Sequence, residues 1–241
     1  MIGLGTIINS GAIIIGGILG HFFGKLIKER VQNTLTSTCG FAVLFIGISG
    51  AMEGMLSVSD NSVKSGRGVF VVVCLLLGAL IGEVLNIEGL FEKFGVFLRE
   101  KTGNSKDKNF VEGFLNASFT VCIGAMAIVG AIQDGLVGDY SILLTKSILD
   151  LIIVMVMTSS MGKGPVFSFI PVFVLQGSVT LLARIIQPVL TEESLGNLSM
   201  VGSILIFCVG VNLIWGKTVK VANLLPAIVL AVAFAFLPIA L

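Results

Sequence analysis

Long apolar runs recur from one end of this sequence to the other, and they constrain the fold more than any other feature. A helix of about 20 apolar residues spans the hydrocarbon core of a bilayer. Only 12% of the residues are charged, against about 25% in soluble domains, and the mean hydropathy is +1.05. The chain lacks the polar residues that would cover a water-facing surface. We therefore expect an all-α, polytopic transmembrane helix bundle.

The apolar runs divide into about eight expected spans within a single integral membrane domain, residues 1–241. The expected ranges are 2–24, 37–56, 68–88, 110–133, 141–161, 166–188, 197–216 and 221–241. The net charge of +1 gives no basic surface for nucleic acid. The four cysteines lie inside apolar runs without paired spacing, so we expect small buried residues and no disulfide, metal or cofactor site.

The longest connection, residues 89–109, places apolar residues at helical spacing among basic ones. This pattern predicts a short amphipathic helix on an anionic leaflet, and a solvated linker is the alternative. Most basic residues of the short loops fall in the odd-numbered connections, namely Lys25, Lys28, Arg30, Lys93, Arg99, Lys101, Lys106, Lys108, Lys163, Lys217 and Lys220. Basic loops stay in the cytoplasm. We therefore expect a multi-pass protein of the cytoplasmic membrane with both termini outside.

Glycine residues recur at four-residue spacing in several expected spans, as in Gly16–Gly20–Gly24, Gly50–Gly54 and Gly78–Gly82. In lipid, small residues allow helix backbones to approach closely, and this contact holds helices together. The stripes predict a tight bundle, and they also allow a homodimer in which one copy packs against another.

Two weak internal similarities suggest an inverted-topology repeat with broken helices. In one register, "SGRGVF" (65–70) matches "GKGPVF" (162–167), and Asn9 corresponds to Asn116. In the other, residues 34–50 match residues 194–210. Each register relates segments that would cross the membrane in opposite directions.

Asp150 is the most unusual residue, because a carboxylate at mid-depth costs at least about 2.5 kcal/mol even on a lenient insertion scale. A helix that starts near Ser141 places Asp150 about 14 Å into a core of about 30 Å. Lys146 lies one turn away on the same face, so the two can form an ion pair. The pair is either a neutralised fastener or a site that binds or exchanges a cation or proton, and we favour the second reading.

Further polar residues could contribute to the same site. Gln133, Asp134 and Asp139 surround a flexible "DGLVGD" segment. This segment is either an outer turn, with Asp139 near the start of the next helix, or a broken helix that lines an entry path. Asn9, Asn116, Gln176 and Asn212 each lie in a different expected span, where they could join helices or line a polar cavity.

Several stretches resemble one bacterial membrane-protein family. They are "GTIINSGAIIIGGILG", "CIGAMAIVGAIQDGLVGD", "LLTKSILD" and "FVLQGS", and the run from Cys122 to Asp150 is the most specific. Over essentially its whole length the chain resembles the family described as domain of unknown function 554. The resemblance implies an inner-membrane protein, often described as a transporter, and it supplies no substrate or catalytic residue.

We therefore expect a secondary transporter or ion-coupled carrier of a small solute or ion, with H⁺ or Na⁺ as candidate ions. A channel, or a non-transporting scaffold or sensor subunit, is the alternative. A scaffold predicts a dry bundle in which every intramembrane polar group is paired. An enzyme is not expected: "VGD" (137–139) lacks the first glycine of the aspartyl intramembrane protease motif, and the chain has a single histidine.

Overall fold

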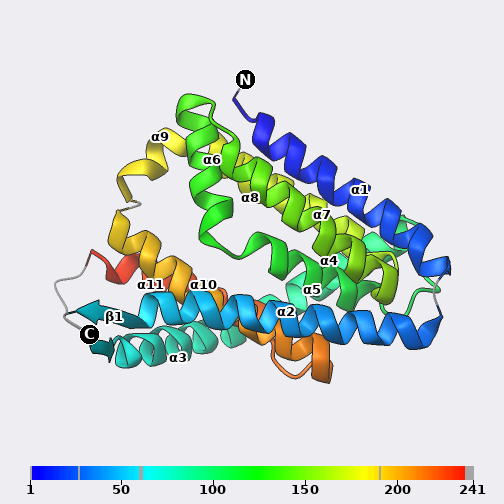
Figure 1. Ribbon diagram of the computed structural model, residues 1–241, viewed down its shortest axis with the longest axis horizontal. Helices are drawn as coiled ribbons and strands as arrows, with labels where there is room; N and C mark the ends of the chain where they lie inside the picture. Colours follow the sequence, from blue (N-terminus) through cyan, green and yellow to red (C-terminus); the bar gives the residue numbers. More distant parts are fainter. Residues whose placement is uncertain (1, 27, 60–61, 190, 237–241) are drawn as a thin grey trace.

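The computed structural model describes residues 2–26, 28–59, 62–189 and 191–236, and these residues are mostly helical (Figure 1). One small β-hairpin, which the sequence did not predict, joins α2 to α3. The helices are α1 (Leu4–Leu26), α2 (Glu29–Met55), α3 (Gly68–Leu85), α4 (Ile87–Lys101), α5 (Phe110–Cys122), α6 (Ala125–Val137), α7 (Ser141–Met161), α8 (Phe169–Leu181), α9 (Ala183–Ile186), α10 (Glu192–Trp215) and α11 (Pro226–Phe234). The shorter elements are β1 (Leu56–Ser59), β2 (Ser62–Ser65), and the 3₁₀ turns η1 (Gly164–Ser168), η2 (Gln187–Val189) and η3 (Val221–Leu224).

Six of the described helical segments are long and apolar enough to cross a membrane: α1, α2, α3, α7, η1 with α8, and α10. A seventh span forms if α5 and α6, bent by 59° at a short break, cross together. The eighth expected segment, 221–241, is the shorter apolar helix Val221–Phe234, and residues 237–241 lie outside the described residues. The polytopic all-α bundle is confirmed.

Several expected boundaries differ from the structure: α10 begins at Glu192 rather than at residue 197, and α8 ends at Leu181 rather than at residue 188. The second helix begins at Glu29 rather than at residue 37, and its first turns contain Thr34, Ser37 and Thr38, whose hydroxyls donate to backbone carbonyls four residues earlier and so are satisfied within the helix. The expected span 110–133 is broken after Cys122, where Gly124 has a φ of 151° that favours glycine.

The first three long helices each pair antiparallel with a helix of the C-terminal part. In α1 and α8, Thr6 faces Thr180 and Asn9 faces Gln176. The glycines of α2 meet α10, and those of α3 meet η3 and α11, and in both pairs the residue numbers rise along one helix as those of its partner fall. Along the chain, α1, α2 and α3 therefore have α8, α10 and α11 as their partners, in the same order. This arrangement agrees with an inverted repeat in the register that matches residues 34–50 with 194–210.

The helix α1 also lies beside α7, and these two helices run in the same direction (Figure 1). Gly16 contacts the backbone of Leu151, and Gly20 contacts that of Met155, so the glycines spaced four residues apart on α1 meet residues spaced four apart on α7. The glycines of α2 and α3 are likewise used in internal contacts. The homodimer therefore gains no support from these glycines and stays a prediction.

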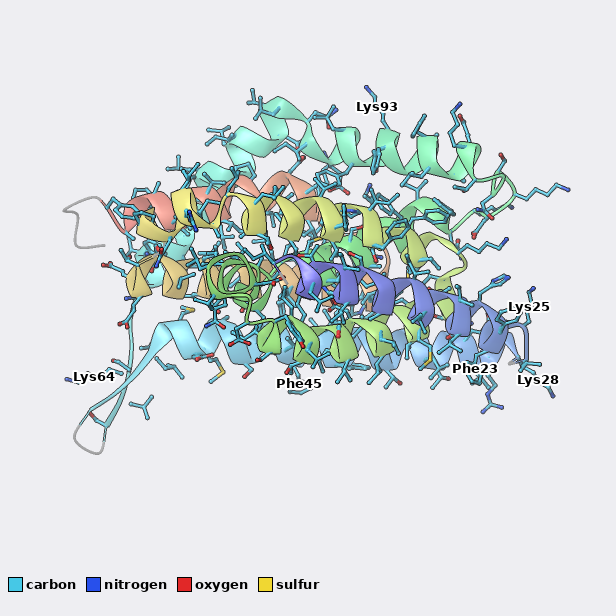
Figure 2. All side chains as sticks on the ribbon, turned by 90° about the horizontal axis from the view of Figure 1, so that it is seen from above. Phe23, Lys25, Lys28, Phe45, Lys64 and Lys93 are labelled. Atoms are coloured by element: carbon cyan, nitrogen blue, oxygen red, sulfur yellow. The ribbon has the colours of Figure 1, made fainter. Side chains whose placement is uncertain are left out.

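The outer surface of the bundle is apolar, as a lipid-facing surface must be. Phe23 and Phe45 point outward, with 52% and 69% of each side chain exposed (Figure 2). Lys25 and Lys28 lie at one end of the molecule and Lys64 at the other (Figure 2). These three lysines, which contributed to the predicted orientation, therefore lie at opposite ends of the long axis of the bundle.

The predicted amphipathic helix is present as α4 (Figure 1). Its inner side packs on α5, where Phe94 lies against Phe114 and Phe91 against Phe119. Leu90 and Phe97 remain exposed on the outside. The helix thus keeps apolar side chains available for lipid, while its position on a leaflet stays a prediction.

Candidate functional site

Four of the predicted site residues meet where α1, α7 and α8 pack together. The ammonium of Lys146 donates to both carboxylate oxygens of Asp150, at 2.7 and 2.6 Å. The side-chain amide of Asn9 donates to the same carboxylate at 3.1 Å and to the carbonyl oxygen of Gln176 at 3.3 Å. Two charges and two amides therefore form one network within the bundle, which we call the Asp150 network.

The Asp150 network is enclosed. Asp150 is 3% exposed, Lys146 8%, Asn9 0% and Gln176 1%. The close approach of α1 to α7 produces this enclosure, because glycines of α1 lie against the backbone of α7 just beyond the network. In this conformation the lysine neutralises the carboxylate, and neither residue lines the cavities described below.

The network does not use all of its hydrogen-bonding capacity. Among the described residues, the carbonyl oxygen of Asn9 and the amide nitrogen of Gln176 have no hydrogen-bond partner. Ser10 and Thr158, on α1 and α7, also have buried hydroxyls without a partner there. Buried polar groups are normally satisfied, so a water, an ion or a solute that entered the network would meet atoms without a partner among the described residues.

Asp134 and Asp139 have structural positions instead of lining an entry path. Asp134 is fully buried on α6 and accepts the backbone N–H groups of Gly3 and Gly5, at 3.1 and 3.0 Å, at the positive end of α1. Asp139 accepts the hydroxyl and backbone N–H of Ser141 at the start of α7, and these bonds hold the pKa of Asp139 below its usual value. The position of Asp139 at the start of α7 agrees with the outer-turn interpretation of residues 134–139, and the side of the membrane on which this segment lies stays a prediction.

Three other predicted residues also lie outside the Asp150 network. Asn212 is used within the chain, since its side chain donates to the carbonyl of Val219 and accepts the N–H groups of Thr218 and Val219. Gln133 is half-buried on α6. Asn116 is buried on α5, and its amide nitrogen has no partner among the described residues.

Asn116 and Asn212 line a charged pocket of about 180 Å³ between α4, α5 and α10. Glu112 and Lys217 line it too, and Lys217 bridges to Glu88, at 3.1 Å, and to Glu92. Burial alone would lower the pKa of Lys217, but its bonds to the two glutamates outweigh this effect and raise it. This ion cluster, which the sequence reasoning missed, fastens α4 to the end of α10.

The helix break forms a second, larger cavity of about 440 Å³. Ser118, Cys122 and Gly124 line it on the side of the break, and the rest of the lining, from α4, α6, α8, α10 and α11, is apolar except for Ser178. Phe119 lines both this cavity and the charged pocket, and its ring packs on Phe91 with centroids 5.4 Å apart. Sequence reasoning considered a broken helix as one of two interpretations of residues 134–139, whereas the break lies between α5 and α6.

Comparison with known proteins gives a family without an assigned activity. The family model described as "Protein of unknown function (DUF554)" matches residues 4–236. The chain is 33% identical over 226 residues to the "Uncharacterized membrane protein YdfK" of Bacillus subtilis (strain 168), covering 94% of this chain and 93% of that protein. It is 31% identical over 232 residues to the "Uncharacterized protein YqgA" of Escherichia coli (strain K12), covering 95% and 94%. No solved structure is a significant match.

Proposed function

The chain belongs to the DUF554 family of membrane proteins of unknown function, and we propose that it is an ion-coupled carrier of a small solute across the cytoplasmic membrane. Asp150 is the ion-exchanging group, with H⁺ or Na⁺ as the ion. Lys146 is its counter-charge in the closed state. The lysine-rich end with Lys25 and Lys28 faces the cytoplasm in this proposal.

The observation that supports the proposal is the incomplete Asp150 network deep in the bundle. A structural ion pair could be replaced by apolar residues at little cost to stability. Asn9 and Gln176 come from α1 and α8, the helices that pair antiparallel across the repeat, and each keeps one polar atom without a partner among the described residues. Binding sites at the interface of inverted repeats are typical of secondary transporters.

The proposed exchange begins from the closed arrangement. A cation or proton that binds the Asp150 carboxylate removes the attraction for the Lys146 ammonium, so the two side chains separate. The amide groups of Asn9 and Gln176 then provide hydrogen-bond partners for the Lys146 ammonium, which the carboxylate no longer holds. Because α1 and α7 are joined by close backbone contact, a shift between them would open the network to one side.

A scaffold or sensor subunit is the second candidate, and a specific observation favours it. Lys146 contacts both carboxylate oxygens at short distance in an enclosed interior, as a structural clamp would. A scaffold, however, needs a dry bundle with paired polar groups. The atoms of Asn9 and Gln176 without a partner, and the cavity at the helix break, favour the carrier.

We expect a jump in Na⁺ concentration or in pH to produce a transient charge displacement in proteoliposomes adsorbed on a solid-supported membrane. The displacement reports ion binding, so the solute need not be known. Asp150→Asn should abolish it, because the exchanging carboxylate is gone.

Asp139→Asn is the matched control, since Asp139 is an exposed aspartate outside the network, and it should keep the full displacement. Equal displacement in wild type and in a correctly folded Asp150→Asn variant would exclude Asp150 as the ion site.

A further inference from the structure

A third pocket lies at the end of the molecule that carries Lys64, between the last turns of α2, the hairpin and the first turns of α10 (Figure 2). Its volume of about 420 Å³ lies within the usual range of ligand pockets, roughly 300–1,000 Å³. Two glycines help to keep this space open, because a Cβ at Gly66 or at Gly196 would meet no atom within 4 Å. In the orientation proposed above, this is the outer end of the protein.

The pocket is lined by two opposite charges. Among the described residues that line it, one is acidic and one is basic, namely Glu53 of α2 and Arg67, which directly precedes α3. Both side chains are exposed. Within the part of the chain that the structure describes, they form an ion pair neither with each other nor with another residue. Each charge is therefore available to a ligand group of the opposite sign.

Arg67 is held in an unusual conformation by a buried neighbour. Its backbone is left-handed, with φ 61° and ψ 13°, although the chain has a glycine on each side of it. Its guanidinium donates at 3.0 Å to the side-chain carbonyl of Asn197, which is 3% exposed and donates in turn to the backbone carbonyl of Ala231. Supported strain of this kind is concentrated at binding sites. The bond to Asn197 directs the guanidinium and leaves its other N–H groups for a ligand.

The rest of the lining decides which kind of molecule fits. Ser57 and Ser199 are polar and uncharged, and Met55, Leu56 and Met200 provide apolar surface. A guanidinium binds a carboxylate or a phosphate, and a carboxylate binds an ammonium. A molecule with a single charge would leave one side of the pocket without a counter-charge. A molecule that carries both charges and a small apolar part would use the whole lining.

We propose that this pocket binds a small zwitterion, with its anionic group on Arg67 and its ammonium on Glu53. The apolar part lies against Met55, Leu56 and Met200. A free amino acid has this chemistry, and so does the headgroup of phosphatidylethanolamine. The site does not depend on the carrier proposal, because binding at this end of the molecule requires no ion exchange in the Asp150 network.

The first test compares three probes that share an apolar body and differ in charge. They are free leucine, 4-methylpentanoate, which lacks the ammonium, and 3-methylbutylamine, which lacks the carboxylate. Wild-type protein is placed in nanodiscs of phosphatidylglycerol, whose headgroup has no cationic group, and each probe is titrated by saturation-transfer NMR. Leucine should bind, and each analogue should bind about tenfold more weakly, because it lacks one charged hydrogen-bonding group.

Substitutions in the pocket assign each charge of the probe to its partner. Glu53→Gln should weaken leucine binding about tenfold and leave 4-methylpentanoate binding unchanged, whereas Arg67→Gln should weaken both. Glu193→Gln and Lys64→Gln are the matched controls, since both residues are exposed at the same end of the molecule but do not line the pocket. Both controls should bind leucine as wild type does.

A third substitution fills the pocket without changing a charge. Gly196→Leu should abolish leucine binding and leave the protein folded, because the new side chain projects into open space. Gly11→Leu has the same open space outside the pocket and should bind leucine normally. Equal affinity for all three probes, no leucine binding in wild type, or unchanged leucine binding in Glu53→Gln, Arg67→Gln or Gly196→Leu would each overturn the proposal.

Nanodiscs of phosphatidylethanolamine distinguish the two sources of the zwitterion. Unchanged leucine binding in these nanodiscs supports a free zwitterion as the occupant, whereas weaker binding supports the lipid headgroup in the same site. The titrations measure occupancy of the pocket, and the charge-displacement experiment measures ion exchange at Asp150. Either experiment can fail while the other succeeds, so the two proposals are tested separately.

Discussion

Replacing Lys146 by methionine should lower the free energy of unfolding by about 3–5 kcal/mol, the usual cost of breaking a buried ion pair. The substitution leaves the Asp150 carboxylate among helices with only the Asn9 amide as a hydrogen-bond donor. The measurement is unfolding of the purified protein in mixed micelles, with the anionic detergent as denaturant.

The double variant Lys146→Met/Asp150→Leu should recover most of that loss and lie within about 2 kcal/mol of wild type, because no charge is then left buried. The remaining loss reflects the hydrogen bond from Asn9 to Asp150. A double variant as unstable as Lys146→Met alone would show that the pair is needed for folding, and would favour the structural clamp.

Gly20→Leu should lower the free energy of unfolding by about 3 kcal/mol or more, because overpacking forces the helices apart. A side-chain Cβ at Gly20 would lie 2.2 Å from the carbonyl oxygen of Met155, and one at Gly16 would lie 2.3 Å from that of Leu151. These atoms belong to a helix backbone, which cannot move aside as a flexible side chain can. Separation of α1 from α7 would also withdraw Asn9 from Asp150, so ion binding should be lost with stability.

Gly11→Leu is the matched control for Gly20→Leu. Gly11 lies in the same helix, but a Cβ there would meet no atom within 4 Å. It should elute from size-exclusion chromatography as wild type does, whereas Gly20→Leu should aggregate. If the two variants behave alike, the parallel contact between α1 and α7 is not as close as described.

The sequence predicted the spans best where an apolar run ends at a strong local signal. The helix α7 has the expected bounds, Ser141–Met161, because Asp139 caps its start and Gly162 ends it. The break in the expected span 110–133 could not be located in the same way. The chain has 30 glycines, and only packing decides that Gly124, and not a neighbour such as Gly130, adopts a positive φ.

The residues of the site could be predicted from the sequence, but which of them meet could not, because this too depends on packing. Asn9, Asp150 and Gln176 were each identifiable as polar residues inside separate spans, but their meeting depends on which helix faces pack together. Asp134 and Asn212 look equally promising in the sequence. They are used instead at a helix end and in a turn, because backbone groups there need hydrogen-bond partners.

The account depends on the charges of Lys146 and Asp150 serving ion exchange rather than holding the helices together. The most direct test is the charge displaced by a Na⁺ or pH jump in the Lys146→Met/Asp150→Leu double variant, measured beside wild type. We predict a clear displacement in wild type and none in the double variant, although both are folded. The account is contradicted by an equal displacement in both proteins, or by none in wild type under either jump.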